Sequence, residues 1–229
     1  MEKAPGTSGA AQPIDLRTPL SLRTSFAFPL QSAAARREVL IGGALLLLPG
    51  VGWLLNMGHR IAFVHNMLHG RPAWPAWRGY GALLRHGALT FGGMAFYYSP
   101  AAALGWAAAR WHSPALAGAA VVLALLATVA IPGYMTHYCW RFDPAEIYDP
   151  FRALSRALEG GADYWRAWGI ALAALAVSLV GLLGLGVGFL ATSVWFWQAA
   201  GFSFATVFAR KFLDAEESGS TDPARPRGA

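Results

Sequence analysis

The sequence predicts an all-α, polytopic membrane protein, and three observations support this fold class. Of the 229 residues, 55% are apolar and 13% are charged, which is about half the charged fraction of an ordinary soluble domain. Four long stretches lack Asp, Glu, Lys and Arg, and the basic residues can be placed almost entirely on one side of a bilayer. We expect about four full crossings, a re-entrant N-terminal hairpin and two interfacial amphipathic helices.

The predicted membrane domain covers residues 23–212. Its uncharged stretches are 21, 24, 30 and 43 residues long and run over Val39–His59, His86–Ala109, Trp111–Trp140 and Ala167–Ala209. Because about 20 apolar helical residues cross the hydrocarbon slab, the longest stretch accounts for two crossings. The tails, residues 1–22 and 213–229, are predicted to be disordered.

The first apolar stretch, Val39–Gly58, is interrupted by proline and glycine at residues 49–52, so it is either one kinked crossing or a hairpin. A hairpin places 17 of the 18 Lys and Arg residues on one side, with only Arg110 opposite. A single crossing gives a split of 12 to 6. Basic residues prefer the cytoplasmic side, which favours the hairpin. Arg60 limits its depth, so we expect a shallow re-entrant hairpin with Arg60 reaching the surface.

The remaining apolar sequence predicts two uninterrupted crossings and a closing hairpin. The crossings cover His86–Ala109 and Pro114–His137, and the hairpin turns at the glycine-rich run 184–188. A weak repeat links the two hairpins, because Gly50-Val51-Gly52-Trp53-Leu54 matches Gly186-Val187-Gly188-Phe189-Leu190. Both pentapeptides are expected at a hairpin turn.

Two loops have the pattern of helices that lie in the membrane interface. Over Pro75–Arg85, Trp77, Leu83 and Leu84 share one face, and the arginines share the other. Over Pro150–Asp163, three apolar residues oppose Arg152, Arg156, Glu159 and Asp163. Such helices bury an apolar face at the headgroup boundary. The alternative is a soluble loop helix packed on its neighbours.

His65 and His69 have the spacing of a zinc-binding pair on one helical face. Asn66 stands where a metalloprotease helix carries its catalytic glutamate, so that chemistry is excluded, and no third ligand is nearby. We interpret both histidines as interfacial and retain them only as weak metal candidates. His137 is also expected to reach the interface.

Asp143, Glu146 and Asp149 form the main acidic cluster, for which a divalent cation is conceivable. Helix capping is the better interpretation, because Asp143-Pro144 with Glu146 matches N-cap, N1 and N3, and Asp149-Pro150 repeats the cap. No acid or base is expected inside the bilayer, where ionisable residues mark transport pathways. The residues expected to have structural or interface roles are Pro49, Gly50, Gly52, Trp74, Trp77, Gly184, Gly186 and Gly188.

With these residues identified, the chain resembles the domain-of-unknown-function family numbered 4013, which are multi-pass membrane proteins of bacteria and archaea. The resemblance spans about residues 23–212. It is carried by Ser25-Phe26-Ala27-Phe28-Pro29 with Arg36 to Gly43, Leu48-Pro49 with Asn56-Met57-Gly58, Gly70 with Trp74-Pro75-Ala76-Trp77 and Gly81, and the closing segment Gly181 to Arg210.

The chain departs from the family pattern at two places. Ala76, Arg78 and Gly79 stand where the family loop usually carries acids, which weakens any inherited cation-binding role, and a proline expected near Ser193 is absent. The resemblance implies a membrane fold and no defined activity.

The leading functional hypothesis is a non-enzymatic protein of the inner (plasma) membrane, with both termini and the basic loops in the cytoplasm. Its expected partners are lipids with anionic headgroups, and also another membrane protein or a second copy of itself. No nucleic acid and no cofactor are expected. The alternative is a small-solute permease or transporter subunit, which a polar cavity lined by Asn56, His59, Arg60, Thr136 and His137 would favour. A third class, a metal-dependent membrane enzyme, requires His65 and His69 to meet an acid.

Overall fold

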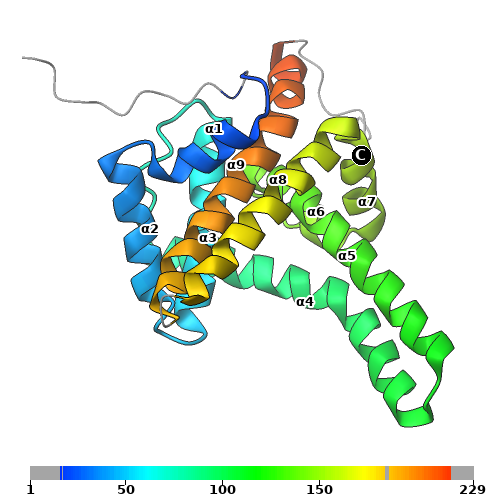
Figure 1. Ribbon diagram of the computed structural model, residues 1–229. Coiled ribbons are helices and arrows are strands. Elements are labelled where there is room, and N and C mark those ends of the chain that lie inside the picture. The colour runs from blue at the N-terminus through cyan, green and yellow to red at the C-terminus, as the bar shows by residue number, and fades with distance from the viewer. Residues whose placement is uncertain (1–15, 17, 184–185, 218–229) are drawn as a thin grey trace, which may run out of the picture.

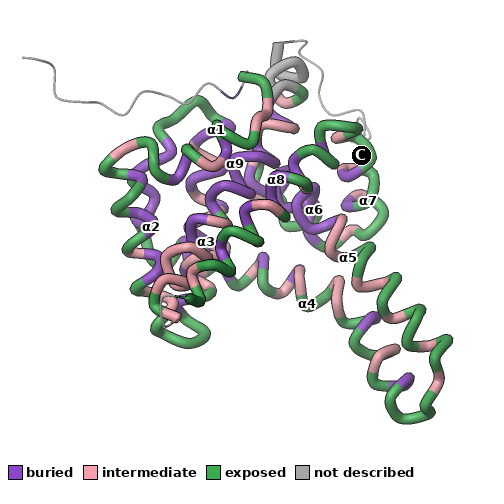
Figure 2. The backbone as a smooth tube through the Cα atoms, in the orientation of Figure 1, coloured by how far each residue is buried: buried purple, intermediate pink, exposed green. Residues whose placement is uncertain are grey.

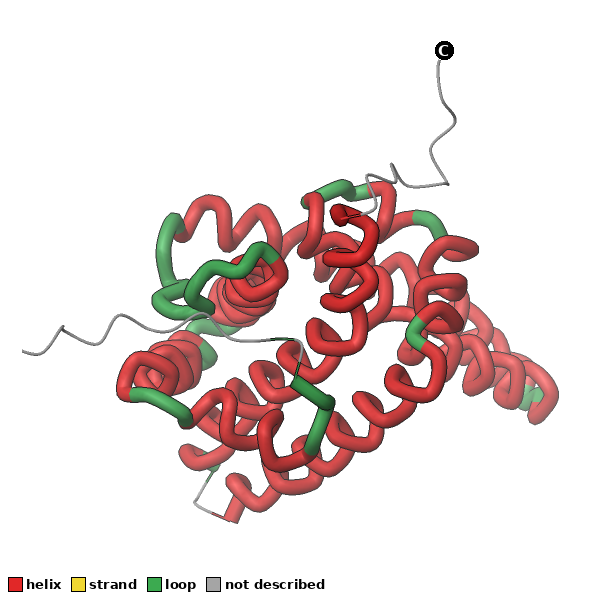
Figure 3. Tube along the Cα trace, turned by 90° about the horizontal axis from the view of Figure 1, so that it is seen from above, coloured by secondary structure: helices red, strands yellow, loops and turns green. Residues whose placement is uncertain are grey.

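The computed structural model describes residues 16, 18–183 and 186–217, with the backbone alone for residue 210 and residues 213–217. The described part is all-helical and contains no strand, which confirms the predicted class (Figures 1 and 3). Its elements are α1 (Leu22–Ala27), η1 (Phe28–Leu30), α2 (Ala33–Leu45), α3 (Val51–Leu68), α4 (Tyr80–Trp111), α5 (Pro114–Arg141), α6 (Ala145–Tyr148), α7 (Pro150–Glu159), α8 (Gly161–Val180), η2 (Gly181–Leu183) and α9 (Val187–Glu217).

The first apolar stretch forms a helical hairpin, as the charge distribution predicts. The chain leaves α2 at Leu45, turns through Pro49 and enters α3 at Val51. Gly50 has a φ of +74°, which only glycine adopts readily. A Cβ on Gly52 would lie 1.8 Å from the carbonyl oxygen of Leu45, so the close turn requires glycine there as well.

The two middle apolar segments, each predicted to be one crossing, are single helices that form a second hairpin. α4 and α5 pack along each other and are joined by a tight turn at His112, after which Ser113 caps α5 through the backbone N–H of Leu116. This α4–α5 hairpin extends away from the rest of the molecule (Figure 1), and most of its outer half is exposed (Figure 2). α4 and α5 therefore contact the other helices mainly at the end of the hairpin that is farther from the turn at His112.

The third hairpin, α8 with α9, packs against the first one. α9 contacts α2 and α3 as well as α8, so the hairpins α2–α3 and α8–α9 pack together. Gly186 has a φ of +79° directly before α9. The hydroxyl of Thr192 donates to the carbonyl oxygen of Ser178 across the hairpin. Gly184, a predicted turn residue, lies outside the described residues.

Among the described residues, two helices are long and apolar enough to cross a membrane. They are α5 and the segment Gly161–Leu183, which joins α8 to η2. The other two predicted crossings, α4 and α9, do not meet the same test of length and hydropathy.

The prediction of an amphipathic helix over Pro75–Arg85 is wrong for its first half. Residues 70–79 are not helical, and α4 begins at Tyr80. The reason is long-range: the backbone N–H of Ala76 donates to the carboxylate of Glu38, and Trp77 is buried against α2 and α3. The second predicted helix does form, as α7, but it ends at Glu159, and Asp163 belongs to α8.

Two predicted boundaries also change. α9 continues to Glu217, beyond the predicted end of the membrane domain at residue 212. Leu16, assigned to the N-terminal tail, is buried in the core with Phe28 and Met67. The predicted disorder of residues 1–15, 17 and 218–229 lies outside the described residues.

Candidate binding site

Two adjoining cavities open between α3, α5 and α9. The first has a volume of about 340 Å³ and the second about 300 Å³. Four residues line both of them: Arg60, Met94, Met135 and Trp197. Most of the other lining side chains are apolar or aromatic, which is the usual character of a site for a small organic ligand.

Arg60 supplies the charge at the boundary of the two cavities. Its guanidinium lies 5.1 Å from the ring centroid of Trp197, and Nη2 is 2.7 Å from Sδ of Met135. Among the described side chains, no carboxylate lies within 4.0 Å of it. Arg60 is half-buried, and its side chain is directed toward α5 and α9; whether it reaches the bilayer surface stays a prediction.

Gln198 lines the first cavity from α9 and was not singled out in the sequence. Its side chain is 1% exposed, and neither Nε2 nor Oε1 has a hydrogen-bond partner among the described residues. A buried amide that lacks partners costs about 1–3 kcal/mol, so each such group needs an explanation. An uncharged residue within an apolar run gives little signal in the sequence.

Glu38 and His59 form a buried pair beside the first cavity. His59 Nε2 lies 2.7 Å from Oε2 of Glu38, and the same oxygen accepts from the backbone N–H of Ala76 at 3.1 Å. The ring of His59 stacks on Trp77, with centroids 4.0 Å apart, and more loosely on Trp74. Two ionisable residues are therefore buried among the helices, whereas the prediction that no acid or base lies inside the bilayer stays a prediction.

The polar residues proposed for a transport path do not all line one of these two cavities. Asn56 and His59 line only the first cavity, and Thr136 lines only the second. Asn56 is used structurally, because its amide donates to the carbonyl oxygens of Gly42 and Gly52 within the first hairpin. His137 lines neither cavity and is buried, so the prediction that it reaches the interface is wrong. Its Nδ1 lies 2.9 Å from the carbonyl oxygen of Gly133.

The candidate metal pair has other contacts. His65 Nδ1 lies 2.7 Å from the carbonyl oxygen of Cys139, and His69 Nδ1 lies 2.9 Å from that of His65. The two rings are 4.1 Å apart, and each stacks on an aromatic ring, Phe142 or Trp140. Within the described part of the chain, no group of three His, Cys, Asp or Glu side chains is arranged to hold a metal ion.

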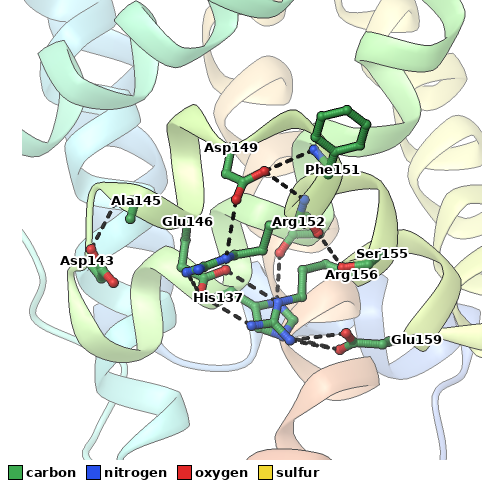
Figure 4. A network of polar contacts seen from close by, with 11 residues as sticks. His137, Asp143, Ala145, Glu146, Asp149, Phe151, Arg152, Ser155, Arg156 and Glu159 are labelled. Atoms are coloured by element: carbon green, nitrogen blue, oxygen red, sulfur yellow. Dashed lines mark hydrogen bonds and ion pairs between the residues drawn. The ribbon is translucent and has the colours of Figure 1, made fainter. Parts of the chain in front are cut away.

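The acidic cluster is a structural network where α5, α6 and α7 meet (Figure 4). Asp149 caps α7, because Oδ1 accepts from the N–H groups of Phe151 and Arg152, as predicted. Asp143 accepts from the N–H of Ala145, two residues on. Glu146 does not complete a capping box. It binds the guanidinium groups of Arg152 and Arg156 instead.

Arg156 joins this network to the end of α7. It contacts both oxygens of Glu146, at 3.2 and 3.3 Å, and reaches Glu159 at 3.1 Å. Partial burial opposes its charge, but the hydrogen bonds and charges of the two glutamates outweigh burial and raise the pKa of Arg156 above its ordinary value. The acids of this cluster contact arginines or backbone N–H groups near helix N-termini, so the network stabilises the loop.

Comparison with protein-family models, curated proteins and solved structures found no match. The resemblance to the membrane family therefore stays a prediction. A function can be argued from the exposed apolar helices of the described structure and from the cavities around Arg60 and Gln198.

Proposed function

We propose that the chain is a multi-pass protein of the inner (plasma) membrane that acts through contacts with lipid or with another membrane protein, and not as an enzyme. One observation carries this proposal. In the most apolar windows of α5 and of Gly161–Leu183, only 17% and 28% of the residues are buried. A core helix of a soluble protein would bury most of these residues, because large exposed apolar surfaces need a non-aqueous partner. Lipid is a partner that can cover the exposed faces of both helices.

The helix lengths support four full crossings by α4, α5, α8 and α9. α4 and α5 have 32 and 28 residues, so at 1.5 Å per residue they measure about 48 and 42 Å, longer than the hydrocarbon thickness of about 30 Å. α2 has 13 residues and measures about 20 Å, which suits a re-entrant hairpin better than a crossing.

α7 supports an interfacial position for its loop. Phe151 and Leu158 are 87% and 82% exposed, whereas the charged Arg156 on the opposite face is directed inward to Glu146. A soluble loop helix packed on its neighbours would have the reverse orientation. An apolar face directed away from the protein fits insertion at the headgroup boundary.

The cavities favour a lipid-like ligand over a small hydrophilic solute. Their lining is mostly apolar, and Asn56, His59, Thr136 and His137 do not share one polar path with Arg60. A permease remains the second candidate only through Arg60, since an intramembrane arginine is costly and often functional.

The test is to separate membranes from cells that express the full chain and to extract them with alkaline carbonate. We expect the protein to stay in the membrane and to require detergent for purification. Recovery as a monodisperse protein in detergent-free buffer would contradict the proposal.

Topology is tested with single cysteines, since Cys139 is the only native one and can be replaced by serine. Arg23→Cys and Lys211→Cys should react with an impermeant maleimide only from the cytoplasmic side. His112→Cys, at the α4–α5 turn, is the matched control and should react only from the outside. Labelling of the first two positions from opposite sides would contradict the predicted topology.

A further inference from the structure

Arg60 carries a charge that the described protein does not neutralise. Its nearest contacts are a thioether and an indole ring, and α3, α5 and α9 surround it with mostly apolar side chains. A partly buried cation without a counter-ion is unfavourable by several kcal/mol. An anion in the cavity would remove this penalty, and a guanidinium group binds carboxylate or phosphate oxygens through paired hydrogen bonds.

Gln198 supplies an independent reason to expect a polar group at the same place. Both polar atoms of its buried amide are unpaired, and it lines the 340 Å³ cavity together with Arg60. A change of side-chain rotamer would turn the amide N–H₂ toward the cavity, where it can donate to an oxygen of the same anionic group. If the cavity stayed empty or held only hydrocarbon, the protein would be more stable with leucine in place of Gln198.

The rest of the two cavities suits an acyl chain. Met94, Met135 and Trp197 connect them, and Val64, Ile131 and Phe204 continue the apolar lining of the second. Each cavity has a volume at the lower end of the range for sites that bind small organic ligands, about 300–1,000 Å³. Together they offer one charged end and a longer apolar part.

We propose that these cavities bind an anionic amphiphile from the surrounding bilayer, with its carboxylate or phosphate on Arg60 and Gln198 and its acyl chain between α3, α5 and α9. This inference rests on the proposed function, because it takes the ligand from lipid. It also names the lipid contact through which the protein acts.

The experiment uses the full chain in nanodiscs of phosphatidylcholine and a fatty acid brominated at mid-chain. Bromine quenches tryptophan fluorescence on contact, and Trp197 lines both cavities. We expect saturable quenching that Trp197→Phe reduces, with the remainder coming from Trp53 and Trp168, each of which lines one cavity. The matched fatty alcohol should bind at least about tenfold more weakly, since a charged hydrogen bond contributes about 1.5–3 kcal/mol. Brominated phosphatidylglycerol, compared with the fatty acid, distinguishes a phosphate from a carboxylate head.

Three variants and one control locate the head. Arg60→Gln should weaken fatty-acid binding at least about tenfold. Arg60→Lys should weaken it less, because lysine keeps the charge. Gln198→Leu, which keeps the volume, should weaken it about threefold to tenfold. Arg110→Gln, at the exposed end of α4, is the control and should leave the affinity unchanged.

Equal binding of the acid and the alcohol by the unaltered protein would overturn the inference, as would equal affinities in Arg60→Gln and Arg110→Gln. If Arg60→Gln does not fold, the inference is still tested by comparing fatty acid with fatty alcohol and by the affinity of Gln198→Leu for the fatty acid. Failure of the unaltered chain to enter nanodiscs contradicts the proposed function. Entry without charge-dependent binding contradicts only this inference.

Discussion

The crossing of α3 and α4 depends on two glycines, and Gly87→Ala tests it directly. A Cβ on Gly87 would lie 1.9 Å from the carbonyl oxygen of Leu54 in α3. The contact is reciprocal, because a Cβ on Gly58 would lie 1.9 Å from the carbonyl oxygen of Leu83 in α4. Backbone therefore touches backbone, and no flexible side chain can move aside.

The expected destabilisation follows from these distances. An ordinary Cβ contact begins near 3.4 Å, so the two backbones would have to separate by about 1.5 Å at Gly87. Overpacking costs about 1–3 kcal/mol where side chains can adjust, and occasionally more. We expect Gly87→Ala to lower the free energy of unfolding by about 3 kcal/mol. The α4–α5 hairpin would also lose part of its attachment to the body.

The assay is reversible unfolding in mixed micelles of a nonionic detergent and dodecyl sulfate, followed by circular dichroism. Gly118→Ala in α5 is the matched control, because nothing lies within 4 Å of the added Cβ. The control should be neutral or up to about 1 kcal/mol more stable, as alanine favours helix more than glycine does. If Gly87→Ala is as stable as Gly118→Ala, the close contact of α3 with α4 is wrong.

Three further substitutions and one control test the buried polar groups and the first turn by thermal unfolding in detergent. Glu38→Leu should cost about 3–5 kcal/mol, because it leaves the N–H of Ala76 without an acceptor and removes the partner of His59, and an unchanged melting temperature would contradict the buried pair. Glu146→Gln should lower the free energy of unfolding by about 2 kcal/mol. Asp163→Asn is the control and should lower it by less than about 0.5 kcal/mol, because both side chains of its ion pair are 63% exposed. Equal effects of the two substitutions would contradict the network in Figure 4. Gly50→Ala should cost about 1–3 kcal/mol because of its positive φ, and a neutral effect would place the turn elsewhere.

The hairpin turns could be predicted because their causes are local. Pro49 and Gly50 end α2 and begin α3 within six residues, and glycine is the residue that adopts the required φ. The repeated pentapeptide has the same structural place in both hairpins. Gly50 and Gly186 each have a φ near +75°, and each directly precedes a helix. The cap at Asp149 was predictable for the same reason, because its hydrogen bonds reach only two and three residues ahead.

The segment before α4 could not be predicted, because distant residues determine it. The spacing of Trp77, Leu83 and Leu84 is compatible with a helix. It is equally compatible with the observed structure, in which residues 70–79 are not helical. The carboxylate that holds the N–H of Ala76 comes from Glu38, 38 residues earlier in the sequence. Local patterns contain no information about such a contact. Glu146 was misassigned for a similar reason, since its arginine partners lie six and ten residues ahead.

The candidate site was only partly visible in the sequence. Arg60 stood out as a charge beside an apolar stretch, but the residues around it come from α5 and α9. Glu38 follows two arginines, and nothing in its local sequence indicates that it is buried. Gln198 carries no charge and lies among aromatic residues, so only its burial without partners draws attention to it.

The contact between Glu38 and Ala76 has a consequence for how the protein is made. Ribosomes add about 5–20 residues per second, so α2 emerges roughly 2–8 seconds before the segment that binds its carboxylate. If α2 enters the membrane as proposed, Glu38 would lie in lipid without its partners during this interval, which disfavours early insertion of α2. We expect the newly made α2 to wait at the translocon or at the headgroups, and to enter together with α3 once the tryptophan loop has left the ribosome.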